Sequence, residues 1–216
     1  LDSGATAGAT IGVTSMDSLA GGLTIRDAGG LATIGTLGAG GTGTVTITDS
    51  QAGVTFSGNV TATTLTITDT DNADDITFAD GQTVALTTLT TAAPAYDVII
   101  NSSTFGVTNA VQFINTGIVT LGNSGSGTDV LTFTGGVDTI GGVTDPATVN
   151  IGSRVVTVGN PIVLGAVTLT AASELDTGNA AGGTIAVGAI TSGGFALVLD
   201  SGATAGATIG VTSMDS

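Results

Sequence analysis

Short segments in which apolar residues alternate with threonine recur along the whole chain. Residues 44–48 read Thr-Val-Thr-Ile-Thr, residues 64–68 read Thr-Leu-Thr-Ile-Thr, and many other segments have the form apolar-Thr-apolar. A period of two places the apolar side chains on one face of a strand and threonine on the other. Gly, Asn, Asp or Ser follows most segments and favours a turn. No stretch of ten or more residues has a helical period, so the pattern predicts an all-β chain with no helix.

The apolar residue that ends each segment recurs at a nearly constant step. Six of these residues are eleven positions apart, and two more follow at ten and twelve: Phe56, Ile67, Phe78, Leu89, Ile100, Val111, Leu121 and Phe133. The spacing predicts a β-solenoid (β-helix) with a half-coil of about 11 residues and about 22 residues per coil. Phe78 then lies over Phe56, and Ile47 lies over Ile25. A sandwich or barrel also suits evenly spaced short strands, but neither needs a constant step.

An exact internal repeat joins the two ends of the sequence. Residues 1–18 and residues 199–216 both read LDSGATAGATIGVTSMDS, at an offset of 198 positions. The repeat predicts a tandem array in which residues 1–198 form one solenoid repeat unit of roughly nine coils. Residues 199–216 then start the next identical repeat, and we expect them to continue the stack with the same backbone path as residues 1–18. The alternative is one domain flanked by two copies of a short tag.

Composition and charge exclude several classes of partner. The 216 residues include 36 Gly, 17 Asp and Glu, 2 Lys and Arg and no Cys, and the net charge is −15. A mean hydropathy of +0.54 argues against disorder. The shortage of positive charge argues against a nucleic-acid partner. No apolar run reaches about 18 residues, so we expect no membrane-spanning segment.

The sequence contains few of the residue types that catalyse reactions. His, Lys and Cys, which supply most general bases and nucleophiles, are missing. We therefore expect that the protein is not an enzyme. The alternative is a pair of carboxylates that hydrolyses glycosides, for which Asp74 and Asp75 are candidates. The two cationic side chains, Arg26 and Arg154, are expected to pair with nearby aspartates at the surface.

Aspartates in turns are the only candidates for a metal site, and no cofactor is expected beyond Ca²⁺. Six positions are candidate Ca²⁺ ligands: Asp69, Asp71, Asp74, Asp75, Asp129 and Asp138. The first four crowd into residues 69–75, which lack the glycine and the distal glutamate of an EF-hand loop. The last two stand in G-x-D-x-apolar segments that resemble the Ca²⁺-binding nonapeptides of RTX β-rolls, with Ser124 replacing a leading glycine. Turn capping by the carboxylates is the alternative.

A further set of aspartates is expected to form a row. Asp27, Asp49 and Asp69 each follow an isoleucine of the predicted core by two residues. Stacked coils would place these like charges one above another, which is unfavourable unless they point into water or a cation such as Ca²⁺ neutralises them.

In its composition and its period, the chain resembles the β-solenoid repeats of giant bacterial surface proteins, namely filamentous-haemagglutinin-like and autotransporter-type adhesins. The likeness rests on units such as VTFSGN at 54–59 and VTLGNS at 119–124 within a long tandem repeat. It implies an extracellular or cell-surface location and a role as a structural repeat of a fibre or stalk. The tandem array itself predicts association end to end, with lateral association in a fibre left open. The alternative is an adhesin-type module that recognises glycan, ice or another surface, with or without Ca²⁺. The Thr-x-Thr runs are similar to ice-binding β-solenoids, but neighbouring coils break that pattern.

Overall fold

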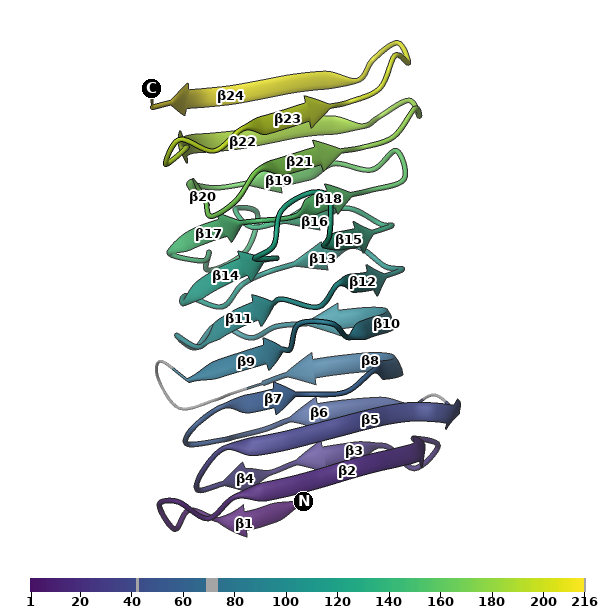
Figure 1. Cartoon of the computed structure of the whole chain (residues 1–216), viewed down its shortest axis with the longest axis vertical. Coiled ribbons are helices and arrows are strands. Elements are labelled where there is room, and N and C mark those ends of the chain that lie inside the picture. Colours follow the sequence, from purple (N-terminus) through teal and green to yellow (C-terminus); the bar gives the residue numbers. More distant parts are fainter. Residues whose placement is uncertain (42, 69–73, 216) are drawn as a thin grey trace.

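A computed structural model describes residues 1–41, 43–68 and 74–215. Within these ranges the chain forms 24 β-strands and no helix, as the alternating pattern predicted (Figure 1). The strands wind upward from the N-terminus to the C-terminus and pair in parallel with strands of the coils below and above. The sandwich and barrel alternatives are therefore wrong.

Each coil contributes to three ladders of parallel strands. The first ladder comprises the beginnings of β2 (Ile11–Ser18) and β5 (Ala32–Gly41), then β7 (Val54–Phe56), β9 (Asp75–Phe78), β11 (Asp97–Ile100), β14 (Ile118–Leu121), β17 (Thr148–Ile151), β20 (Val167–Leu169) and the ends of β22 (Thr184–Thr191) and β24 (Thr208–Met214). The second comprises the ends of β2 and β5, the beginnings of β8 (Val60–Ile67) and β10 (Thr83–Thr90), then β12 (Thr104–Val107), β15 (Val130–Phe133), β18 (Arg154–Val156), β21 (Ser173–Asp176) and β23 (Leu197–Asp200). The third comprises β3 (Leu23–Ile25), β6 (Thr44–Ile47), the ends of β8 and β10, then β13 (Val111–Gln112), β16 (Val137–Asp138), β19 (Ile162–Leu164) and the beginnings of β22 and β24. The short strand β1 (Asp2–Gly4) pairs with β4 (Asp27–Ala28).

The first ladder gives the length of a coil. Nine register steps lead from Ile11 to Met214, so a coil averages roughly 23 residues. The predicted β-solenoid of about nine coils, each close to the expected length, is confirmed. Nine steps at about 4.8 Å each span about 43 Å along the axis. Individual steps vary: the step from Val119 to Val149 is the longest on this ladder, and the next, from Val149 to Val167, is the shortest.

The predicted half-coil of eleven residues needs a correction, because a coil has three sides. From Phe56 to Leu121 the series alternates between the first ladder, which holds Phe56 and Phe78, and the third, which holds Ile67 and Leu89. Its last member, Phe133, lies on the second ladder. The second ladder lies between them in sequence, and its strands lack the apolar-Thr-apolar form in several coils. An example is Thr-Phe-Gly-Val at residues 104–107.

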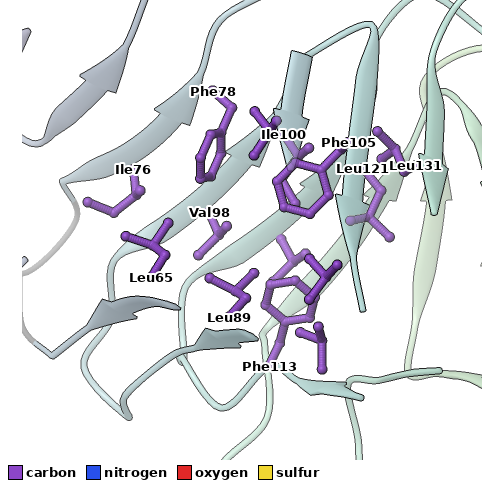
Figure 2. Packing of buried hydrophobic residues seen from close by; sticks show 14 of the residues in the cluster. Leu65, Ile76, Phe78, Leu89, Val98, Ile100, Phe105, Phe113, Leu121 and Leu131 are labelled. Carbon is purple, nitrogen blue, oxygen red and sulfur yellow. The ribbon is translucent and has the colours of Figure 1, made fainter. Parts of the chain in front are cut away.

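The interior is a continuous column of apolar side chains (Figure 2). The predicted stacking is confirmed: Phe56 pairs with Phe78, and Ile25 pairs with Ile47. The rings of Phe56 and Phe78 are 5.0 Å apart between centroids and nearly parallel. Phe78 also meets Phe105 of the second ladder edge to face, with centroids 5.3 Å apart. Such ring pairs stabilise beyond the area they bury.

The two identical 18-residue segments lie on different ladders, although both form a glycine turn followed by a strand. The expectation that residues 199–216 repeat the path of residues 1–18 one unit along the axis is therefore wrong in its position around the axis. Ile11 lies on the first ladder opposite Ala32, whereas Ile209, its equivalent in the second copy, lies on the third ladder opposite Ile185. Figure 1 shows this plainly, because β2 and β24 run in opposite directions across the view. Eight full steps lead from Ile11 to Ile190, and two further ladders lead to Ile209. The sequence offset between the two copies therefore spans eight and two-thirds coils.

Candidate functional site

Asp129 closes a loop by capping it. Its side chain is fully buried between β14 and β15, and Oδ2 accepts hydrogen bonds from the backbone N–H groups of Asn123 and Ser124, each at 3.0 Å. A carboxylate that accepts hydrogen bonds from two local N–H groups caps a turn. The turn-capping alternative thus describes the geometry of Asp129.

Asp138 has a similar local role on the third ladder. Its Oδ1 accepts hydrogen bonds from the N–H groups of Ile140 at 2.8 Å and Gly141 at 3.0 Å. In the sheet, Asp138 pairs with Gln112 on one side and Val163 on the other. Among the residues that the structure describes, no group of three or more acidic side chains could hold a metal ion.

The acidic segment at 69–75 is only partly described. Asp69 and Asp71 lie outside the described residues. The carbonyl oxygen of Asp74 accepts a hydrogen bond from the N–H of Asp97 at 3.0 Å. Asp75 lies directly opposite Asp97 in the next coil. Partial burial, and after it the negative charge of Asp97, raises the pKa of the Asp75 carboxyl above its ordinary value of 3.8.

The predicted row of aspartates is visible for two of its members. Ile25 pairs with Ile47, and the N–H of Gln51 donates to the carbonyl oxygen of Ala28, so Asp27 and Asp49 take equivalent places in successive coils. Asp27 also pairs with Asp2 in β1. Asp69, the third predicted member, lies outside the described residues.

Arg154 forms the expected pair with acidic neighbours. It lies opposite Glu174 in the ladder, and its guanidinium contacts Asp176 at 2.5 Å and Glu174 at 3.4 Å. The hydrogen bond to Asp176 is the main reason that the pKa of Arg154 rises above its ordinary value. The group is partly exposed, so the pair contributes little to stability by itself.

Threonines of the third ladder form an ordered outer surface. One column contains Thr24, Thr46, Thr66 and Thr90, and a second contains Thr44, Thr64 and Thr88. The Thr-x-Thr pattern therefore occupies three consecutive coils, whereas the sequence had shown only two runs. The third was missed because residues 87–91 read Thr-Thr-Leu-Thr-Thr, in which two adjacent threonines on each side hide the alternation. Hydroxyls are about 6.7 Å apart along a strand and about 4.8 Å apart between coils.

A shallow groove of about 530 Å³ crosses the outside of the upper coils. Small or apolar residues line it, among them Ile140, Gly165, Gly188 and Gly210. None of the described residues in its wall is acidic or basic. Those residues offer contact area but no group that could transfer a proton as a general acid or base.

The repeated strand sequence lies at both ends of the stack, and each copy leaves one edge unpaired within the described residues. β2 pairs through its upper edge with β5, and β24 pairs through its lower edge with β22. The exposed fraction of Ile209 is 47%, whereas that of the equivalent Ile11 is 9%. Val211 and Met214 are also exposed beside Ile209. One strand sequence is thus seen in two settings, once with a neighbour above and once with a neighbour below.

Comparisons with known proteins give no relative for this chain. No family model, curated protein or solved structure matches it. Within the described ranges, none of the secondary structure is a helix of the length and apolarity needed to cross a bilayer.

Proposed function

We propose that this chain is a structural segment of a long extracellular fibre or stalk, built by tandem repetition of the 198-residue unit and without catalytic activity. The observation that carries the proposal is the pairing of the repeated strand. Residues 11–18 pair with a coil above, and residues 209–214, which repeat residues 11–16, pair with a coil below. A strand that pairs well through both edges belongs in the middle of a stack.

The energetics of a solenoid favour continuation of the stack. Each coil covers the apolar interior of its neighbour and satisfies its backbone N–H and C=O groups, and uncapped ends leave both open. Ile209, Val211 and Met214 carry the interior column to the upper end, where they remain exposed. A following unit would bury all three.

The extracellular location rests on the resemblance to bacterial surface repeats and on the nature of the surface. The chain has no cysteine, so folding outside the cell needs no disulfide pairing. A net charge of −15 keeps fibres apart in solution. Threonine-rich outer faces present rows of hydroxyls to solvent, which keeps the fibre hydrated.

Sedimentation velocity of the 216-residue chain at micromolar concentration tests the proposal. We expect end-to-end oligomers that lengthen with concentration. Val211→Lys places a charge in the open apolar column and should suppress them, whereas Ser213→Lys, on the outward side of the same strand, should not. A monodisperse monomer for the unmodified chain would contradict the proposal.

The ordered threonines favour one alternative, a binding module that recognises ice. Three coils of Thr-x-Thr in register present hydroxyl and methyl groups at regular spacings. Thermal hysteresis measured on the chain tests this function. Activity that is lost in Thr66→Lys but kept in Thr132→Lys, on the second ladder, would support it. No hysteresis at millimolar concentration would exclude it.

A further inference from the structure

After one sequence repeat, the chain does not come back to the ladder on which it started. From Ile11 to Ile209 the chain advances eight and two-thirds coils, so equivalent residues lie on different ladders. We propose that successive 198-residue units are joined by a screw relation in which the third ladder of one unit continues as the first ladder of the next. This inference rests on the proposed tandem fibre and specifies how its units meet.

The occupant of the free edge of β24 is residues 32–41 of the following unit. In the lower copy of the repeated strand, Ile11 lies opposite Ala32, Val13 opposite Ile34 and Met16 opposite Leu37. Transferring this register to the upper copy places the following unit's Ala32, Ile34 and Leu37 over Ile209, Val211 and Met214.

The layers below and above β24 both place apolar side chains against the same three residues of that strand. Below β24, the same three residues lie over Ile185, Val187 and Ile190. Three consecutive layers therefore direct apolar residues inward at each of the three positions. The pairing of β22 with β24 contains no register shift, so the lower half of the junction is regular. The pairing of β2 with β5, which is the pattern for the upper half, is regular from Ile11 to Met16 and shifts register only after Met16.

The turn before the strand provides a second contact at the junction. The N–H of Gly8 donates to the carbonyl oxygen of Gly29 at 2.7 Å, and a side chain at Gly29 would clash with the carbonyl oxygen of Thr6. Thr204 and Gly206 repeat Thr6 and Gly8. The following unit's Gly29 would therefore seat against Thr204, in the same close approach that only glycine allows.

The screw relation fixes the symmetry of the fibre. Eight and two-thirds coils rise about 42 Å, and a residue returns to its original side only after three units, which comprise 26 coils and about 125 Å. A unit of nine whole coils would instead repeat about every 43 Å on one side. The two arrangements differ little in rise per unit but about threefold in the true axial period.

Disulfide trapping in the 216-residue chain tests the ladder assignment, because the chain has no cysteine of its own. Gly210 lies opposite Ala186, and a side chain at Gly210 meets no atom within 4 Å. Neighbouring strands bring Cα atoms within the range that a disulfide spans. Ala186→Cys with Gly210→Cys should oxidise to an intramolecular disulfide. Thr191→Cys with Gly210→Cys, the pair expected for nine whole coils, should not. Cross-linking of the second pair, or of neither, would overturn the screw relation.

Electron microscopy of a four-unit tandem chain tests the fibre itself. Thr90→Cys in every unit, coupled to biotin and decorated with streptavidin, should place labels on three sides, with the same side recurring at about 125 Å. Labels on one side about every 43 Å would refute the screw relation while leaving the proposed fibre intact. A four-unit chain that forms no rod would contradict the fibre and the screw relation together.

Discussion

Phe78 is the side chain whose removal should weaken the stack most clearly. It is fully buried, lies parallel to Phe56 of the coil below at 5.0 Å, and meets Phe105 of the coil above edge to face at 5.3 Å. Phe78→Ala therefore removes contacts at two interfaces between coils. Loss of a buried phenylalanine costs about 3–5 kcal/mol, and a ring pair adds about 0.5–1.5 kcal/mol beyond its buried area. We expect a loss near the upper end, about 4–5 kcal/mol.

Urea unfolding followed by circular dichroism measures this loss, with Phe195→Ala as the control. Phe195 is the same residue type, but 43% of its surface is exposed, so its truncation should cost less than about 1 kcal/mol. A double-mutant cycle with Phe56→Ala should give a coupling of about 1 kcal/mol. Equal losses for Phe78→Ala and Phe195→Ala would refute the claim that the aromatic column holds the coils together.

Three further predictions concern charge, backbone space and metal. Because the pKa of Asp75 is raised above 3.8, the folded state binds the proton more tightly, and the contribution of Asp75 to stability falls as pH rises above that value. Asp75→Asn should therefore raise the urea midpoint at pH 7, and the gain should vanish below pH 3.8; a gain that persists there would contradict the linkage. Gly43→Ala should destabilise strongly, since its Cβ would clash with the carbonyl oxygen of Leu19, whereas Gly12→Ala, with open space, should change the midpoint little. EDTA should leave the melting temperature unchanged, and a drop of several degrees that Ca²⁺ reverses would reveal a bound cation.

The sequence predicts the strands and the coil length because burial imposes a period on them. The stacking of Phe78 over Phe56 and of Ile47 over Ile25 follows from two successive eleven-residue steps. The second ladder was missed because alternation there uses Gly106 or charged residues such as Arg154 and Glu174 in place of threonine. Their outward positions do not require one residue type, so composition alone does not mark the strand.

The change of ladder between the repeated segments was also hidden from the sequence. Coil length varies, as the long step from Val119 to Val149 and the short step from Val149 to Val167 show, and the variation is absorbed in loops that tolerate insertions. Dividing the repeat by the expected coil length suggests nine whole coils, whereas only the actual register shows the missing third of a coil. Asp129 and Asp138 were selected by a glycine-rich motif, but local N–H groups determine where their carboxylates lie.

The ladder hydrogen bonds run parallel to the axis, while the covalent chain winds around it, and this arrangement determines how such a fibre would respond to tension. Pulling on the ends loads the hydrogen bonds of each coil in series before it stretches any covalent bond. A coil of roughly 23 residues occupies about 4.8 Å in the stack but reaches about 75 Å when extended. A coil that unfolds from the end of the stack would therefore become roughly fifteen times as long as its height in the stack. Unfolding of successive coils would absorb a sudden load without breaking the backbone.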